Sequence, residues 1–414
     1  MIKEIHSSQL RVGMYLHKLG VSWFKHPFVQ NAFLLESADD LRTIREHGIE
    51  KVWIDTERGD DLVVEPAAPA PAAPRLDLPT RAPDALKTPG PPAPAVSPEP
   101  PKRTSMQAEV AQARKLCAMA KKEMASMFND ARMGKVVKAG DAMPLVEEIS
   151  ASVLRNPTAL ISVARIKTHD EYTFMHSVAV CALMVALARQ MDLEEHLVME
   201  AGIGGMMHDL GKAMMPLEVL NKPGKLTDDE YTIMKGHPEA GWKMLLESGE
   251  ATEGTLDIAL HHHEKIDGSG YPKGLKGDRI SLLSRMGAIC DVYDAVTSNR
   301  PYKQGWDPAE SIKRMASWKG HFDETIFKAF VRSIGIYPVG ALVRTRSDKL
   351  GVVIEQNDQS MLKPKIRVFF SARSNAPIPQ QVLDLASPAC REEIAGVEQA
   401  QDWGFENLER FWME

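Results

Sequence analysis

The sequence predicts a mainly α-helical protein, with a helical bundle preceded by a small α+β domain and followed by a short β-rich segment. Three observations predict this order. A chain of 414 residues exceeds the size that one hydrophobic core usually serves. Thirteen of its 27 prolines lie between Pro66 and Pro101 and separate an N-terminal part from the rest. Beyond them the composition favours helices, and past Pro338 it changes to alternating β-branched residues.

The N-terminal domain is expected to cover residues 1–65. Residues 51–55 and 62–64 are short runs rich in Val and Ile, which is typical of strands, and a helical stretch is expected over 39–47. No group of residues in this domain has the spacing of a catalytic site. The Pro- and Ala-rich residues 66–103 cannot bury a core, so we expect a semi-extended linker of polyproline type there.

The helical domain is expected to span residues 104–340, and the β-rich C-terminal segment residues 341–414. The first helix is rich in Ala, Met, Lys and Glu and precedes Gly134, a common helix stop. The Asn156-Pro157 pair separates the second helix from the third. Helices are predicted over 106–132, 142–155, 158–166, 172–190 and 194–207, and strands over 341–345, 351–355 and 365–370.

Charge, cysteine content and hydropathy exclude several classes of protein. The net charge of −6 and the pI of about 6.1 argue against broad nucleic-acid binding. The four cysteines form no CxxC pair, so neither a disulfide framework nor a thiolate zinc site is expected. The longest apolar run, residues 178–188, is shorter than the roughly 20 residues that span a bilayer, and the N-terminus lacks an apolar signal core. We therefore expect a cytoplasmic protein without a membrane span.

Histidines and carboxylates concentrate in the helical part. Eight of the 13 histidines lie between His169 and His263, and His208-Asp209 and His262-His263-Glu264 place imidazoles beside carboxylates. This ligand mixture suits Zn, Mn or Fe. A carboxylate can bridge two ions about 3.5–4 Å apart, which polarise a phosphoryl oxygen and lower the pKa of a bound water toward ~7. Each residue alone is more often structural, but together they favour a metal centre inside a bundle.

Two motifs resemble a known family. Residues 208–212, His-Asp-Leu-Gly-Lys, match the motif of the HD superfamily of metal phosphohydrolases. Residues 262–272, His-His-Glu-Lys-Ile-Asp-Gly-Ser-Gly-Tyr-Pro, match the extended signature of its HD-GYP subfamily. His237 lies between the two motifs, and residues 291–303 follow the second one, also in family register. The resemblance covers about residues 140–340. Residues 1–65 resemble, more weakly, a small module of unknown function that often precedes this domain.

The resemblance implies both an activity and a set of site residues. The family consists of cyclic di-GMP phosphodiesterases, which are helical domains with a non-haem iron or manganese centre. Asp209, Lys212 and Asp294 are the implied catalytic residues, with Asp209 bridging the ions and Asp294 near the attacking water or the substrate. Lys212, Arg300 and Lys303 would bind phosphates. The implied metal ligands, carried over by position, are His176, His208, Asp209, His237, His262, His263 and Asp291.

The position four residues before the first ligand departs from part of the family. Some members carry a glutamate there that supports a third metal ion, whereas this chain has Tyr172. Glu171 is no replacement, because one residue along a helix turns a side chain by about 100°. We therefore expect a binuclear iron or manganese centre without a third ion.

The expected reaction is hydrolysis of cyclic di-GMP to the linear dinucleotide pGpG, to GMP, or to both. Two alternatives stay open. One is a nucleotide phosphohydrolase of the wider HD superfamily, and the intact Gly-Tyr-Pro signature speaks against it. The other is a catalytically weak cyclic di-GMP receptor, or an adaptor that docks diguanylate cyclase (GGDEF) proteins through the Gly-Tyr-Pro loop. The resemblance is also compatible with a homodimer.

Overall fold

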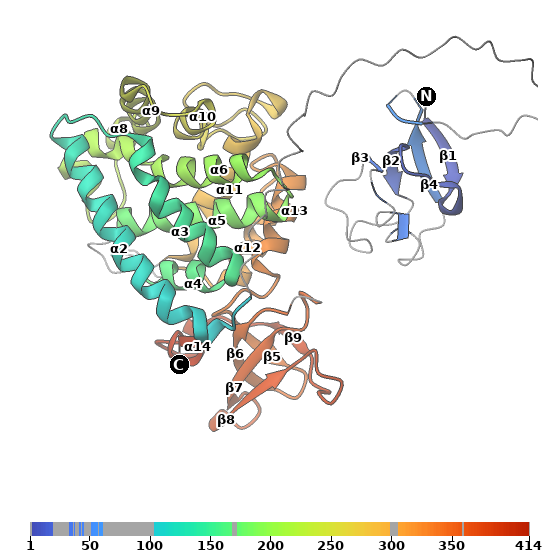
Figure 1. Cartoon of the computed structure of the whole chain (residues 1–414). Helices are drawn as coiled ribbons and strands as arrows, with labels where there is room; N and C mark the ends of the chain where they lie inside the picture. Colours follow the sequence, from blue (N-terminus) through green and yellow to red (C-terminus); the bar gives the residue numbers. More distant parts are fainter. Residues whose placement is uncertain are drawn as a thin grey trace, which may run out of the picture. The chain divides into compact units, whose positions relative to one another are not determined.

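The structure, a computed structural model, divides into two compact units, Met1–Glu99 and Pro100–Glu414 (Figure 1). The expected linker and the expected strand at 62–64 lie outside the residues that it describes, as do most of the expected helix at 39–47 and residues 299–304, which include Arg300 and Lys303. The described residues are 2–19, 33–35, 37, 41–42, 44, 51–56, 58–60, 103–167, 172–298, 305–357 and 360–413.

The N-terminal unit contains an antiparallel four-stranded sheet of order β1-β4-β2-β3. Its strands are β1 (Ile2–His6), β2 (Tyr15–Leu19), β3 (Phe33–Leu34) and β4 (Lys51–Asp55), with the short 3-10 turn η1 (Ser7–Gln9) after β1. Val52 and Ile54 of β4 are both fully buried. Because alternate strand residues point to the same face, this face of β4 joins the small core of the unit.

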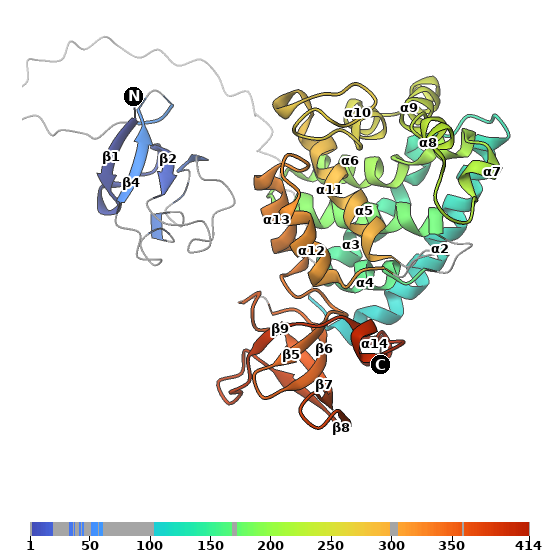
Figure 2. The ribbon, with the colours of Figure 1, turned by 180° about the vertical axis from the view of Figure 1, so that it is seen from behind.

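The second unit is a helical bundle built around α5 (Tyr172–Gln190). Helices α2, α3, α4, α6, α11 and α13 all pack against α5, which lies in the middle of the bundle (Figures 1 and 2). The remaining bounds are α2 (Met106–Arg132), α3 (Met143–Arg155), α4 (Ala159–Arg165), α6 (Glu195–Met207), α7 (Leu217–Leu220), α8 (Asp228–Met234), α9 (His237–Ser248), α10 (Glu253–His261), α11 (Leu282–Thr297), α12 (Pro308–Ser317) and α13 (Glu324–Ile334).

Helix α5 is an apolar helix of the core. Its segment Thr173–Gln190 is long and hydrophobic enough to cross a membrane by composition alone, but 78% of it is buried inside the protein. Every residue from Val178 to Ala188 is buried against neighbouring helices. A helix that is apolar all round and packed on all sides is a core helix, so α5 is the interior support of the bundle.

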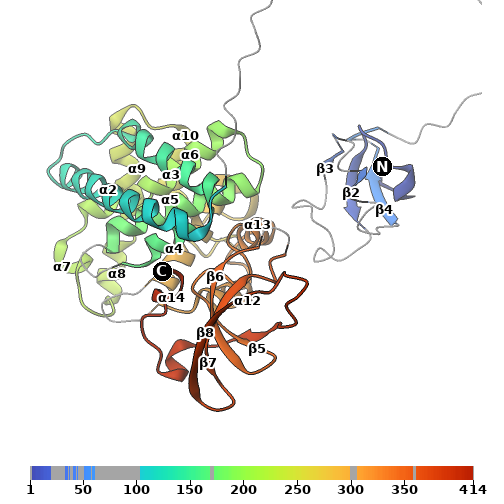
Figure 3. The same ribbon diagram turned by 60° about the horizontal axis from the view of Figure 1, so that its bottom comes forward.

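The C-terminal part of the second unit is an antiparallel five-stranded sheet of order β8-β7-β6-β5-β9. The strands are β5 (Leu342–Thr345), β6 (Lys349–Glu355), β7 (Lys365–Ser371), β8 (Ala376–Asp384) and β9 (Ile394–Val397), followed by η7 (Ala400–Trp403) and α14 (Arg410–Met413). Strands β8 and β9 were not among the predicted strands. Helix α14 packs against both β6 and α2 (Figure 3), which ties the sheet to the bundle.

Asp307 makes a second connection between the bundle and the sheet. Its Oδ1 accepts the backbone N–H groups of Ala309 (2.8 Å) and Glu310 (3.2 Å) and so caps the start of α12. Its Oδ2 accepts the N–H of Leu342, the first residue of β5, at 3.1 Å. The mainly α-helical fold with a β-rich C-terminal segment, predicted from the sequence, is confirmed.

Candidate metal centre

Five segments of the bundle bring the predicted ligands together. His176 comes from the central helix α5, and Asp291 comes from α11, which packs against α5. His208 and Asp209 follow the end of α6, His237 begins α9, and His262 and His263 follow α10. All of them are buried except His263, whose side chain is 22% exposed. The structure therefore gathers all seven predicted ligand side chains in the bundle interior.

The two carboxylate oxygens of Asp209 face different imidazoles. Oδ2 lies 3.5 Å from His176 Nε2 and 3.4 Å from His208 Nε2. Oδ1 lies 3.2 Å from His237 Nε2 and 3.9 Å from His262 Nε2. One carboxylate thus stands between two pairs of ring nitrogens, which is the arrangement that a bridging ligand of two ions requires.

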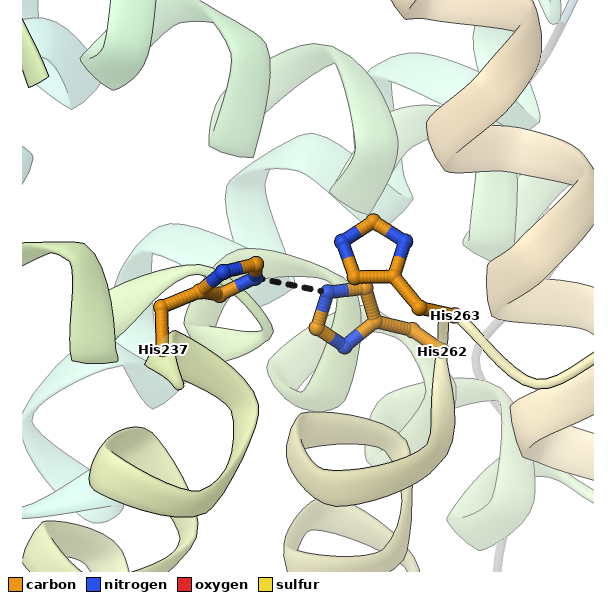
Figure 4. A group of neighbouring side chains, drawn as sticks. All are labelled: His237, His262 and His263. Carbon is orange, nitrogen blue, oxygen red and sulfur yellow. Dashed lines mark hydrogen bonds between the residues drawn. The ribbon is translucent and has the colours of Figure 1, made fainter. Parts of the chain in front are cut away.

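Two groups of ligand atoms lie on either side of this carboxylate. The first is His176, His208 and Asp291, and the second is His237, His262 and His263; within each group the ligand atoms are all within 4.8 Å of one another. Figure 4 shows the second group, in which His237 Nε2 and His262 Nε2 are 3.3 Å apart. Both groups consist of imidazole, with one carboxylate in the first, and this donor set suits Mn, Fe or Zn.

Unpaired polar atoms in the centre also fit a metal ion. His208 Nε2 and Asp209 Oδ1 are buried, and within the described part of the chain neither has a hydrogen-bond partner of acceptable geometry. Burying polar atoms without partners costs free energy, and native proteins rarely leave such atoms unsatisfied. Coordination to a cation would satisfy both atoms, so the residues present fit a metal centre.

The rings of three histidines are held by backbone carbonyl groups. Nδ1 of His208 lies 2.8 Å from Gly205 O, Nδ1 of His237 lies 2.7 Å from Met234 O, and Nδ1 of His262 lies 3.0 Å from Ile258 O. A carbonyl oxygen only accepts, so Nδ1 carries the proton in each case. The unprotonated Nε2 is then the nitrogen turned toward the centre, as metal coordination requires.

Electrostatics also put two ligands in the protonation state that binds metal. Burial, together with the neighbouring imidazoles, lowers the pKa of His262 well below its usual value, so the ring is neutral. Burial alone raises the pKa of Asp209, but the charge of Lys212 acts in the opposite direction and helps to hold the pKa of this carboxyl well below its usual range. Ligands must be unprotonated before they coordinate an ion, and these two already are.

Two of the predicted catalytic residues lie on different sides of the centre. Lys212 Nζ is 2.5 Å from Asp209 Oδ2, and the Lys212 side chain is 22% exposed, so it reaches the accessible side. Asp294 is only 2% exposed, and its Oδ2 lies 2.6 Å from Nδ1 of His176, the ring nitrogen opposite the centre. This placement favours a role for Asp294 in orienting His176 over the expected contact with the attacking water.

The signature segment 262–272 is a tightly held loop. The buried Glu264 accepts the backbone N–H groups of Lys273 (2.7 Å) and Leu275 (3.0 Å), which closes the loop on itself. The ring of Tyr271 packs on the ring of His263 at a centroid distance of 4.7 Å. A Cβ on Gly270 would lie 2.4 Å from the backbone N of Lys265, so only glycine fits there. The loop therefore fixes His263 through both its backbone and its tyrosine.

Comparison with known proteins decides the family. Residues 155–326 match the HD domain family, and residues 2–142 match a domain of unknown function, DUF3391. A Pseudomonas aeruginosa protein named cyclic di-GMP phosphodiesterase is 52% identical over 413 residues, covering 100% of this chain and 96% of that one. The chain belongs to the HD-GYP family. The predicted membership is thereby confirmed, and the match to the N-terminal domain extends past residue 65 as far as residue 142, so it includes all of α2.

Two other HD-GYP relatives match shorter parts of the chain. The cyclic di-GMP phosphodiesterase response regulator RpfG of Xanthomonas campestris is 42% identical over 151 residues, which cover 35% of this chain and 39% of that one. The 3'3'-cGAMP-specific phosphodiesterase 1 of Vibrio cholerae is 34% identical over 178 residues, which cover 42% of this chain and 41% of that one. HD-GYP relatives thus include enzymes named for two different cyclic dinucleotides, so the substrate of this member needs a direct test.

Proposed function

We propose that this HD-GYP protein hydrolyses cyclic di-GMP in the cytoplasm at a binuclear iron or manganese centre. The observation that carries the proposal is Asp209, whose two oxygens face two groups of ligands in a chain that is 52% identical to a named cyclic di-GMP phosphodiesterase. One ion would be held by His176, His208, Asp209 and Asp291, and the other by Asp209, His237, His262 and His263.

Each part of the site has a distinct task in this proposal. Bound ions of this kind supply a polarised phosphoryl oxygen and a water of lowered pKa. Lys212 offers a cationic donor to a phosphate oxygen from the accessible side of the centre, and Arg300 and Lys303 are the further phosphate ligands expected from the family resemblance. Docking of GGDEF proteins on the Gly-Tyr-Pro loop and a homodimer stay predictions.

Chromatography of reaction products tests the proposed function. Anaerobically purified protein of known metal content would be incubated with cyclic di-GMP, 3'3'-cGAMP and simple nucleotides. We expect cyclic di-GMP to react fastest and to give pGpG, GMP or both. Preference for simple nucleotides would favour the general phosphohydrolase, and tight binding without turnover by the metal-loaded protein would favour the receptor.

Activity is expected to depend on the oxidation state of the centre if iron occupies it. Ligand sets of imidazole and carboxylate hold Fe(II) and Mn(II) with little discrimination. Air oxidation or chelation should lower the rate, and a reductant or added Mn²⁺ should restore it. The measurement is the rate of cyclic di-GMP hydrolysis by anaerobic, oxidised, chelated and reconstituted samples; equal rates in all four would contradict a metal-dependent reaction.

Replacing Arg300 with Ala is expected to lower kcat/KM about tenfold or more, because the phosphate loses a charged donor that is worth roughly 1.5–3 kcal/mol. Metal content should match the wild type, since Arg300 is not an expected ligand. Arg346→Ala is the control, because Arg346 is 73% exposed and forms a surface ion pair with Glu393. If Arg300→Ala and Arg346→Ala both show wild-type kinetics, Arg300 does not bind phosphate.

A further inference from the structure

Lys167 is a lysine buried in the middle of the bundle. Its side chain is 0% exposed, and its Nζ donates to the carboxylate of Asp294 and, at 3.0 Å, to Ser298 Oγ. Lysine is almost never fully buried unless it is paired, because removing its charge from water is costly. Lys167 follows α4, whereas Asp294 and Ser298 lie at the end of α11. The lysine therefore joins two parts of the chain 127 residues apart in sequence.

Asp294 also forms a hydrogen bond with His176. Asp294 Oδ2 accepts from Nδ1 of His176 at 2.6 Å. On the other side of the ring, Nε2 of His176 lies 3.0 Å from Asp291 Oδ1 and 3.5 Å from Asp209 Oδ2, within the first group of ligands. A continuous chain of polar contacts thus runs from the ammonium group of Lys167 to the metal centre.

His176 differs from three other predicted ligands in what orients it. His208, His237 and His262 bond through Nδ1 to carbonyl groups of the preceding helical turn, so their own local backbone fixes them. The ring of His176 bonds instead to a side-chain carboxylate from another helix. A carboxylate can rotate about its own bonds, so it orients a ring well only when other groups hold it in turn.

We propose that Lys167 is a positioning residue of the metal centre: it fixes the carboxylate of Asp294 and thereby holds His176 with Nε2 toward the ion site that His208 and Asp291 share. Ser298 assists, because its Oγ lies 3.0 Å from Lys167 Nζ and 3.3 Å from Asp294 Oδ1. The inference rests on the proposed binuclear centre. It concerns one ion site only, since the second group, His237, His262 and His263, does not include His176.

The test is titration of the metal-free full-length protein with Mn²⁺, followed by calorimetry. The variants are Lys167→Met, which keeps the length of the side chain and removes its charge, Asp294→Asn and the double variant. The matched control is Arg155→Met, which breaks a different buried ion pair of the same bundle: Arg155 lies 2.7 Å from Glu109, which is 2% exposed. Circular dichroism and thermal unfolding of each protein measure folding separately from metal binding.

We expect wild-type protein to bind two Mn²⁺ ions, and Lys167→Met to bind one of them about ten- to a hundredfold more weakly while the other is unchanged. Asp294→Asn should weaken the same ion. The double variant should bind this ion no more weakly than whichever single variant has the lower Mn²⁺ affinity, because both residues act through His176. Arg155→Met should lower the melting temperature and leave both Mn²⁺ affinities as in the wild type.

Four results would overturn the proposal. They are wild-type Mn²⁺ binding by folded Lys167→Met, full additivity of the two single variants, equal weakening by Arg155→Met, and weakening of both ions alike. If Lys167→Met does not fold, Asp294→Asn decides, because it is close to isosteric, and wild-type binding by it would overturn the proposal. Wild-type protein that binds no Mn²⁺ would instead overturn the proposed metal centre itself.

Discussion

Replacing Asp209 with Ala is expected to abolish hydrolysis of cyclic di-GMP and to deplete the metal centre of both ions, while the bundle stays folded. The two oxygens of this carboxylate face His176 and His208 on one side and His237 and His262 on the other. A ligand shared by two ions contributes to the binding of each, so its loss affects metal content as well as rate. Folding should survive, because Lys212, which loses its partner, is 22% exposed and reaches water.

Metal analysis, the initial rate and circular dichroism of Asp209→Ala measure these three effects. Asp130→Ala is the control, since the side chain of Asp130 is 41% exposed and pairs with Lys135 on the surface. It should keep the wild-type rate and metal content. Full occupancy by both ions together with a near-normal rate in Asp209→Ala would show that Asp209 does not bridge them.

Replacing Gly270 with Ala is expected to lower the rate by about a hundredfold, the loss that follows when a reacting group shifts by about 1 Å. A Cβ at this position would lie 2.4 Å from Lys265 N, 2.5 Å from Glu264 Cα and 2.6 Å from His263 O. All three are backbone atoms and cannot rotate away. The backbone next to the ligand His263 must therefore move, and the imidazole moves with it.

Gly287→Ala is the matched control for this substitution. Gly287 lies on α11 near the same centre, but its added Cβ would meet Ile258 at 3.5 Å and His262 at 3.7 Å, which are ordinary contacts. We expect the kcat of Gly287→Ala to stay close to wild type and that of Gly270→Ala to fall. Equal kinetics for the two variants would mean that the loop can relax without displacing His263.

The sequence predicts the core of the fold well where local signals are strong. The helices expected over 106–132 and 172–190 have the same bounds in the structure, because helix-forming composition and continuous burial agree along them. Strand β8 shows why other elements are missed. All of its residues are exposed or half-buried, it contains Pro377 and Pro379, and pairing with β7 defines it. Such an edge strand carries no apolar alternation of its own.

At the candidate site, the sequence identifies which residues take part but not the role of each one. The motifs identify the residues that meet at the centre, but Asp291 and Asp294, three residues apart on one helix face, look equivalent in the sequence. Packing separates them, since Asp291 faces Nε2 of His176 and Asp294 faces Nδ1. Lys167 belongs to no motif, and only the tertiary fold brings it to Asp294. The role of a residue that depends on long-range packing therefore cannot be predicted from the spacing of residues along the sequence.

The single carboxylate of Asp307 bears on how this chain can be recombined with others. It caps α12 with one oxygen and holds the first residue of β5 with the other. Domain exchange succeeds where few contacts cross the boundary. The junction near residue 340 lies between two elements that share a hydrogen-bond acceptor, so it is a poor place for a fusion. An exchange of the N-terminal unit should join before residue 103 and carry the C-terminal sheet along with the bundle.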